Sequence, residues 1–384
     1  MENQKTIAVV LGTRPEAIKL APVIRELKLD PDSWNVKVVA TAQHRELLDR
    51  VLDLFEISAD IDLDIMRANQ DLFGLTVKAL HGLGETFAEM RPDLVLVQGD
   101  TTSVFTGALA AFYHQIPVGH VEAGLRTDMR YSPFPEEINR HLTGVLTDLH
   151  FAPTRRAAWN LRQEGYDDST ITIAGNTVID ALLDVAGREE DPLPEGVDEN
   201  KPLILVTAHR RESFGAPLER AFGALAKLAE MHPECQIVYP VHPNPKVRKA
   251  ANENLGASRN IILLDPMDYG PFVSLMKRAK LVLTDSGGIQ EEAPSLGVPV
   301  LVLRSVTERP EAVHSGTVKL VGTDPDKIIG EADRLLTDSD YHERMAASIN
   351  PYGDGKASER IVSAISHFFF KTGRPENFSV ESDA

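Results

Sequence analysis

Short apolar runs alternate with segments of helical periodicity along nearly the whole of this 384-residue chain. The runs are the length of buried strands, and between them apolar residues recur at helical spacing, as in 17–27 and 72–90. Strands that alternate with helices form parallel sheets, because each strand needs a crossover before it can pair with the next. The chain is long enough for two such cores. We therefore expect an α/β protein of two doubly wound domains.

The expected strands fall into two groups. Those of the first half are 6–11, 36–40, 94–97, 117–121, 149–152 and 171–174, and those of the second half are 203–207, 237–241, 261–264, 281–284, 298–303 and 318–321. Between the groups, the proline-rich stretch 191–196 interrupts all periodicity and marks a linker region. We place the domain boundary near residue 175.

Acidic residues follow two neighbouring strands of the first group. Asp100 comes just after 94–97, and Glu122 ends 117–121. Because the carboxyl ends of parallel strands form the ligand crevice, we expect these two acids side by side, with Glu136 arriving from the next loop. Neighbouring like charges push carboxylate pKa values apart, which makes a proton donor and a proton acceptor from one residue type. The pattern predicts an acid/base site.

Each acid also has a structural interpretation. Asp100 stands before Thr101, where a carboxylate serves as a helix cap. Glu136 follows Pro135, a good first helical residue, and an acid there complements the helix dipole. Glu122 ends a strand and has no cap to provide, so the prediction of a site rests most on this residue.

A glycine-rich turn follows the strand 281–284 in the second half. It reads Asp285-Ser286-Gly287-Gly288 and leads into a helix. Glycines let a ligand approach the backbone, and a helix start offers free N–H donors, so the turn suits a phosphate group. An ordinary strand-to-helix turn uses the same residue types. Cations gather at this predicted edge, because His209, Arg210 and Arg309 also follow strands.

Charge and cysteine content exclude several classes of protein. Forty Lys and Arg against 57 Asp and Glu give a net charge of −17, and no basic run stands out, which argues against nucleic acid and anionic membranes as partners. Cys235 is the only cysteine, so the chain has neither a disulfide framework nor a thiolate metal cage. The first residues form a strand rather than a signal peptide, and no apolar run approaches the ~20 residues of a membrane helix. We expect a cytoplasmic protein.

Motifs for common cofactors are absent. No Gly-x-Gly-x-x-Gly follows a strand, and no Gly-x-x-x-x-Gly-Lys-Ser/Thr occurs, so neither a nicotinamide nor NTP hydrolysis is supported. His120-Val121-Glu122 resembles the start of a zinc deaminase signature, but the paired cysteines of that signature are missing. We expect no metal and no cofactor.

Seven motifs follow one another along the chain: Gly12-Thr13-Arg14-Pro15-Glu16, Gln98-Gly99-Asp100-Thr101, His120-Val121-Glu122-Ala123-Gly124-Leu125-Arg126, Pro135-Glu136-Glu137, His209-Arg210-Arg211-Glu212, Asp285-Ser286-Gly287-Gly288 and Thr307-Glu308-Arg309-Pro310-Glu311. This ordered set resembles the non-hydrolysing UDP-N-acetylglucosamine 2-epimerases of bacteria, from about Thr6 to Arg360. The resemblance implies a GT-B-like fold of two Rossmann-like domains, 1–175 and 176–351, with the active site in the cleft between them and a C-terminal helix in 352–384 that returns to the first.

The resemblance also implies a reaction and a set of roles. UDP-N-acetylglucosamine and UDP-N-acetylmannosamine would be interconverted for cell-envelope or capsule polymers by a homodimer, through loss of UDP to a 2-acetamidoglucal and its re-addition. Catalysis is expected from Asp100, Glu122, Glu136 and His209. Binding of UDP is expected from Arg14, Lys19, Phe272 beside uracil, Ser286, Gly287, Gly288, Glu292 at the ribose, and Arg309.

The chain departs from its relatives at several positions. Ser305-Val306 replaces an Asp-Thr or Asp-Asn pair beside Arg309. Gln43, Arg210 and His242 match relatives that a second sugar nucleotide regulates, whereas Glu46 and Asn69 do not. An allosteric site is therefore a hypothesis. A hydrolysing epimerase, a GT-B glycosyltransferase and a non-catalytic nucleotide-sugar sensor are the alternatives.

Overall fold

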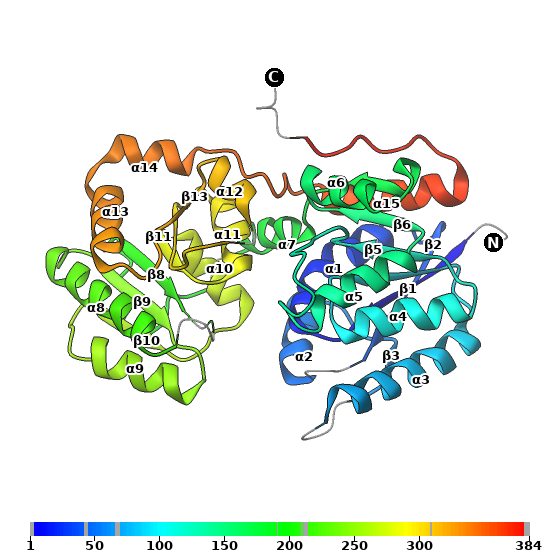
Figure 1. The fold of residues 1–384 in the computed structure, drawn as a ribbon, viewed down its shortest axis with the longest axis horizontal. Helices are drawn as coiled ribbons and strands as arrows, with labels where there is room; N and C mark the ends of the chain where they lie inside the picture. The colour runs from blue at the N-terminus through cyan, green and yellow to red at the C-terminus, as the bar shows by residue number, and fades with distance from the viewer. Residues whose placement is uncertain are drawn as a thin grey trace. The chain divides into compact units, whose positions relative to one another are not determined.

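The computed structural model describes residues 4–41, 45–65, 70–189, 191–208, 210, 214–307 and 309–379. The chain divides into two compact units, each an α/β layer structure (Figure 1). Unit 1 comprises Met1–Ala181 and Tyr352–Ala384, and unit 2 comprises Leu182–Pro351. The division falls within helix α7, Thr177–Ala186.

Unit 1 is built on a parallel sheet that has seven strands among the described residues, in the order β3-β2-β1-β4-β5-β6-β7. This is the Rossmann order, in which the crossovers reverse direction between β1 and β4 and leave a crevice at the carboxyl ends of those strands. The strands are β1 Lys5–Leu11, β2 Trp34–Ala40, β3 Ile61–Asp62, β4 Leu94–Gln98, β5 Val118–Val121, β6 Leu149–Ala152 and β7 Ile171–Ile173.

The helices of unit 1 cover both faces of this sheet. Apolar side chains of β1 and β4 are fully buried, as expected for a central parallel strand. The helices are α1 Arg14–Lys28, α2 Arg45–Leu54, α3 Leu72–Met90, α4 Thr102–Tyr113, α5 Glu136–Val145, α6 Arg155–Gln163, α7 and, from the far end of the sequence, α15 Ala357–Phe370.

The C-terminal segment completes unit 1. Helix α15 packs on α1, and the rings of Phe370 and Trp34 lie 5.3 Å apart. Beyond α15 the segment drawn in red in Figure 1 reaches the edge strand β7, where Phe378 N donates to Ile173 O at 2.7 Å. Helix α15 and the segment after it thus belong to unit 1.

Unit 2 repeats the architecture with six strands among its described residues, in the order β10-β9-β8-β11-β12-β13. Its described strand pairs are parallel. The strand order gives the same crossover reversal as in unit 1, here between β8 and β11. Its elements are β8 Leu203–Thr207, α8 Ala216–Met231, β9 Gln236–Pro240, α9 Pro245–Leu255, β10 Ile261–Leu264, α10 Tyr269–Lys277, β11 Ala279–Thr284, α11 Gly287–Glu292, β12 Val300–Val302, α12 Pro310–His314, β13 Val318–Leu320, α13 Pro325–Thr337 and α14 Ser339–Ala346.

The two chain crossings at the edge of unit 1 are adjacent. Asn176 N donates to Tyr352 O at 2.7 Å. The carboxylate of Asp180 accepts bonds from the backbone N and the hydroxyl of Ser358, both at 2.7 Å, and so caps the start of α15. Unit 2 is therefore one continuous segment inserted into unit 1.

The strand and helix order expected from the sequence is confirmed in both units. The two-residue strand β3 was missed, because its apolar run is too short to show a period. No helix among the described residues is both long enough and apolar enough to cross a lipid bilayer.

Candidate active site

Glu122 stands directly after β5 and is almost fully buried, with 9% of its surface exposed. Lys19 Nζ of helix α1 lies 2.6 Å from its Oε1. Gln98 Nε2 donates to the other carboxylate oxygen, and Asn176 Nδ2 donates to Oε1 at 3.4 Å. Side chains from three distant parts of the chain therefore hold this carboxylate in one orientation, as an acid/base group requires.

The backbone of Glu122 is strained. Its φ of +67° lies in the left-handed region, which costs a residue other than glycine about 1–2 kcal/mol. Gly124, two residues on, has a φ of +86°, and a Cβ there would overlap the carbonyl oxygen of Ala157. The turn after β5 therefore directs the Glu122 side chain at a cost in backbone energy, which is typical of functional sites.

Asp100 follows β4, the neighbour of β5 in the sheet. Gly99, which stands between the end of β4 and Asp100, has a φ of +84°. A Cβ on Gly99 would lie 3.8 Å from Glu122 Oε2, so the turn that carries Asp100 lies against the Glu122 carboxylate. Arg140 of α5 pairs with Asp100 through Nη2 at 2.7 Å and Nε at 2.9 Å. The two strand-end acids thus each have their own cation.

Buried side chains also fix the backbone of this turn. His120 Nε2 lies 2.7 Å from Gly99 O, and Asn139 Nδ2 donates to Asp100 O at 2.9 Å. Burial lowers the pKa of His120 to about 4, so the ring is neutral near pH 7 and its Nε2–H donates to Gly99 O. The Nδ1 atom of His120 is then left buried with no partner among the described residues.

Arg140 is itself held in place. Glu137, one turn back along α5, accepts from its Nη1 at 2.8 Å and from the backbone N–H groups of Thr127 and Asp128 at 3.0 Å each. Although burial opposes ionisation, these bonds keep the pKa of Glu137 below its usual value. The ionised Glu137 therefore fixes the guanidinium that fixes Asp100.

The residues at which α4 and α5 begin decide between the structural interpretations of Asp100 and Glu136. The interpretation of Asp100 as a cap is wrong, because Thr101 is the N-cap of α4 and its hydroxyl accepts from Val104 N at 3.4 Å. Helix α5 begins one residue later than expected, because Pro135 is its N-cap and Glu136 is its first residue. Glu136 and Arg14 are half-buried, and the side chain of neither forms a hydrogen bond or ion pair with another described residue.

Glu16 is a buried acid of unit 1 that the sequence analysis did not assign. Its carboxylate accepts from Gly12 N at 2.7 Å and from Thr13 Oγ1 at 2.8 Å. Burial raises the pKa of Glu16 to about 7, and the charge of Asp100 raises it further, against the lowering effect of hydrogen bonds from Thr101, Thr13 and Gly12. The spacing Thr-x-x-Glu of a capping box was the signal available in the sequence.

In unit 2 the glycine-rich turn follows β11 as predicted. Ser286 is the N-cap of α11, and Gly288 is exposed with no atom within 4 Å of a Cβ placed on it. A Cβ on Gly287 would lie 3.3 Å from Arg309 Cζ, so the guanidinium packs over this glycine. The structure thus brings together the hydroxyl, the two glycines and the cation that the sequence places far apart.

Arg309 is oriented by an acid that the sequence analysis missed. Glu291 of α11 is buried, and its Oε1 accepts from Arg309 Nε at 2.7 Å. Glu292, the next residue, accepts from Tyr269 Oη at 3.0 Å. Phe272 lies on α10, one turn after Tyr269, and is half-buried. No signal in the sequence distinguishes these two adjacent glutamates.

The remaining predicted residues of unit 2 lie on its loops. Arg210 N donates to Asp285 Oδ2 at 2.9 Å, and the exposed His242 accepts from Asn244 N at 3.2 Å through Nδ1. Ser305 and Val306 are exposed. Gln43 and His209, two of the predicted site residues, lie outside the described residues, as do Asn69 and the side chain of Glu46.

Two features outside these turns resemble ligand sites. His232, Glu234 and Cys235 bring one possible metal-ligating atom each to within 4.8 Å of one another. However, His232 Nδ1 and Nε2 lie 3.1 and 3.0 Å from Glu234 and Asp333, which satisfies the ring without a metal. Burial raises the pKa of the Cys235 thiol to about 11, which disfavours the thiolate that a metal needs.

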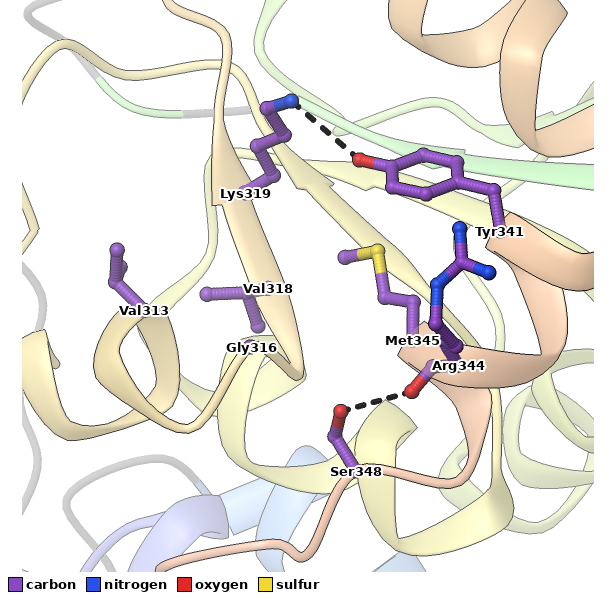
Figure 2. Close-up of a pocket in the computed structure, with 8 residues that line it drawn as sticks. All are labelled: Val313, Gly316, Val318, Lys319, Tyr341, Arg344, Met345 and Ser348. Carbon is purple, nitrogen blue, oxygen red and sulfur yellow. Dashed lines mark hydrogen bonds between the residues drawn. The ribbon is translucent and has the colours of Figure 1, made fainter.

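The second feature is a pocket of about 420 Å³ beside the edge strand β13, shown in Figure 2. Tyr341 of α14 lies on one side, with its hydroxyl 3.4 Å from Lys319 Nζ, and Met345 lies between Val318 and Arg344 in this view. No predicted site residue lines this pocket. The lining residues are Val313, Gly316, Val318, Lys319, Tyr341, Arg344, Met345 and Ser348.

Known proteins resemble this chain over nearly its whole length. A family model described as UDP-N-acetylglucosamine 2-epimerase matches residues 25–366. The UDP-N-acetylglucosamine 2-epimerase of Escherichia coli strain K12 is 55% identical over 368 residues, 94% of this chain and 98% of the relative. A crystal structure of a putative UDP-N-acetylglucosamine 2-epimerase from Listeria monocytogenes superimposes with a TM-score of 0.92 at 47% identity, covering 98% of this chain and 100% of that one.

A second solved structure carries a ligand. The UDP-GlcNAc 2-epimerase from Neisseria meningitidis, bound to UDP-GlcNAc, has a TM-score of 0.85 and 47% identity, and covers 94% of this chain and 99% of that one. Together with the two Rossmann-type sheets, these relatives define a GT-B-like isomerase. The chain belongs to the UDP-N-acetylglucosamine 2-epimerase family.

Proposed function

We propose that this protein interconverts UDP-N-acetylglucosamine and UDP-N-acetylmannosamine by eliminating UDP and adding it back. One observation carries the proposal: Asp100 and Glu122 end neighbouring strands, and a separate cation holds each carboxylate. Relatives described as UDP-N-acetylglucosamine 2-epimerases support the choice of substrate.

The chemistry of the sugar explains why two acids are needed. Carbon 2 has no adjacent carbonyl, so removal of its proton alone would leave an unstabilised carbanion. If the C1–O bond to UDP breaks as the C2–H bond breaks, the C–H electron pair forms a C1=C2 double bond and UDP leaves with the C1–O electrons. A carboxylate takes the proton, giving a 2-acetamidoglucal. A diphosphate oxygen then bonds to C1 again while an acid delivers a proton to the other face of C2.

The neighbouring acids of unit 1 supply these proton transfers. Glu122 and Asp100 approach from adjacent strands, and each has a fixed partner, Lys19 or Arg140. Glu136 is the third proposed acid/base group, and His209 is proposed to assist at the departing UDP. The proposal needs no metal or redox cofactor, because the leaving group carries away the electrons of its own bond.

The turn after β11 is the proposed UDP site. Free N–H groups at Gly287 and Gly288, the Ser286 hydroxyl and the Arg309 guanidinium suit a diphosphate. Glu292 and Phe272 are proposed to contact the ribose and the uracil, and Arg14 to add a cation from unit 1.

Exposed apolar side chains on unit 1 support a homodimer. Phe73 and Val77 on α3, Phe112 and Tyr113 on α4, and Val145 on α5 are all exposed, and these three helices are consecutive neighbours on unit 1. A second copy of this chain is the proposed occupant. Light scattering after gel filtration should give twice the chain mass for the wild type and the single chain mass for F73D/V77D. Met231→Asp, an exposed apolar position on α8, is the control and should stay dimeric; a monomeric wild type would refute the dimer.

The proposed regulatory site comprises Gln43, Arg210 and His242. A second molecule of UDP-N-acetylglucosamine is its proposed ligand. Sigmoidal kinetics with UDP-N-acetylmannosamine, abolished by a trace of UDP-N-acetylglucosamine, would support this site, and hyperbolic kinetics would contradict it. The proposed setting is the cytoplasm, where the product would supply cell-envelope polysaccharide synthesis.

Incubation with UDP-N-acetylglucosamine in deuterated water tests the reaction. We expect deuterium at carbon 2 with the diphosphate still attached, seen in proton and phosphorus spectra, together with the manno epimer. Free UDP and N-acetylmannosamine as the main products would indicate a hydrolysing enzyme, and transfer to an added acceptor would indicate a glycosyltransferase. Unchanged substrate would refute the proposal.

A further inference from the structure

Glu16 links the starts of two helices at the edge of the sheet where the acids lie. It belongs to the first turn of α1, after β1, and is 2% exposed. Its carboxylate accepts from Gly12 N and Thr13 Oγ1 of its own turn and from the hydroxyl of Thr101, the N-cap of α4. Strands β1 and β4 pair directly, so Glu16 joins two neighbouring turns.

The Thr101 hydroxyl cannot turn freely. Its oxygen accepts from Val104 N at 3.4 Å to cap α4, so its hydrogen is the part that reaches Glu16. An ionised Glu16 accepts bonds from all three of its donors. Protonation places a hydrogen on one oxygen and leaves fewer acceptor sites for the same three donors. Three donors directed at Glu16 therefore favour the carboxylate.

Thr101 is the residue after Asp100, and the other bonds to this turn come from elsewhere. His120 holds Gly99 O, and Asn139 holds Asp100 O. Glu16 adds an attachment at Thr101, on the side of Asp100 next to α4. The backbone N of Gly99 also donates to Val121 O at 3.0 Å, and Arg140 holds the Asp100 carboxylate itself.

We propose that ionised Glu16 is a positioning residue for Asp100, which it acts on through the Thr101 hydroxyl. The inference rests on the proposed function, because Asp100 is a proton-transfer group only in that reaction. Glu16 does not touch the substrate in this proposal. It keeps the Asp100 carboxylate in register with the C2 hydrogen, and a displacement of about 1 Å costs a reaction of this kind up to ~100-fold in rate.

The ionisation of Glu16 falls within the working pH range. Burial raises its pKa to about 7, and the facing charge of Asp100 acts in the same direction, while the bonds from Thr101, Thr13 and Gly12 oppose the shift. The carboxylate fraction therefore rises from roughly one tenth at pH 6 to roughly nine tenths at pH 8. If the carboxylate positions Asp100, turnover must rise over the same interval.

The test compares pH profiles of turnover for the wild type and Glu16→Gln, followed by deuterium entry at carbon 2. We expect the wild-type kcat to rise with an inflection near pH 7 that the variant lacks, so that at pH 8.5 the variant is about 10-fold slower and at pH 6 within about 3-fold. The KM should change by less than about 3-fold, because the nucleotide contacts are elsewhere. Glu26→Gln is the matched control: this half-buried acid of the same helix also has a raised pKa, through burial and through Glu359 and Asp180, and its removal should leave the profile unchanged.

Thr101 provides an independent arm. Thr101→Ser keeps the hydroxyl and should keep the wild-type profile, whereas Thr101→Val should flatten it as Glu16→Gln does. If Glu16→Gln reproduces the wild-type profile, or if Thr101→Val does, the inference is overturned. A wild type that incorporates no deuterium would instead overturn the proposed function. The ionisation of Glu16 would then still show in the pH dependence of unfolding.

Discussion

The two units use acids in opposite ways at corresponding edges of their sheets. In unit 1 the carboxylates of Asp100 and Glu122 stand at strand ends, and the cations Arg140 and Lys19 hold them. In unit 2 the cation Arg309 lies over the glycine-rich turn, and a carboxylate on a helix holds it. In each case the group on the turn is the one that suits the proposed chemistry, and its counter-ion is scaffold. The role of a charged residue therefore depends on which member of its ion pair reaches the turn.

The largest expected effect comes from removing charge from the unit 1 acids. Asp100→Asn and Glu122→Gln should each lower kcat by about 1,000-fold or more, because proton transfer by a positioned group contributes ~100- to 10,000-fold. KM should change much less. Turnover and carbon 2 exchange measure this effect, and wild-type rates for both variants would show that these acids do no chemistry.

Glu16 contrasts with Asp100 and Glu122, because hydrogen bonds rather than a cation hold its carboxylate. It is a buried acid held by hydrogen bonds, and its pKa is raised to about 7. A raised folded-state pKa means that the native state binds the proton more tightly, so Glu16 contributes stability below about pH 4.5 that is lost as pH rises through about 7. Relative to the uncharged Glu16→Gln, the wild type should lose up to about 3 kcal/mol between those values.

Urea denaturation at several pH values measures this difference. The free energy of unfolding of Glu16→Gln minus that of the wild type should increase from pH 5 to pH 8. A constant difference would mean that Glu16 keeps one protonation state throughout this range, and the pH dependence expected of it would be absent.

The acids of unit 2 should act on binding rather than on rate. Glu291→Gln leaves Arg309 without its charged partner and should weaken UDP binding by about 10-fold, since a hydrogen bond to a charged group is worth roughly 1.5–3 kcal/mol. Glu331→Gln, which removes the charged partner that lies 2.7 Å from Lys319 elsewhere in unit 2, is the control and should leave the affinity for UDP unchanged. Isothermal titration with UDP gives the affinity, and an effect of Glu291→Gln on kcat alone would break the contrast between the units.

Exposed ion pairs should contribute the least to the free energy of unfolding. Lys227 and Glu230 on α8 lie 3.0 Å apart with side chains 58% and 68% exposed. Lys227→Ala should change the free energy of unfolding by less than about 0.5 kcal/mol, because solvent screens such pairs. A larger change would show that distance alone, rather than burial, governs the paired charges of both units.

The sequence predicted the fold because periodicity is a local signal. Apolar runs such as 6–11 and 94–97 indicate buried strands without any knowledge of their neighbours. The strand-end rule then placed Asp100 beside Glu122. The carboxyl edge of a parallel sheet follows from strand order alone, so this part of the candidate site could be anticipated.

The partners of those acids could not be anticipated. Lys19 is 103 positions from Glu122, and its pairing depends on the direction of a side chain on α1. Arg140, His120 and Asn139 likewise reach the Asp100 turn from elements whose packing no local pattern specifies. Sequence spacing gives the edge at which a residue lies, whereas the contact that tunes its charge is a property of the tertiary structure.

The insertion of unit 2 into unit 1 bears on how the molecule is made. A ribosome that has delivered residues through Ala181 has released every strand of the first sheet that the structure describes but not α15, which packs on α1. Unit 2 is one continuous segment, and the chain leaves and re-enters unit 1 at adjacent points, where Asn176 meets Tyr352. Unit 2 can therefore fold before α15 has been synthesised and before unit 1 is complete. During synthesis, the half that emerges first is therefore the half that is finished last.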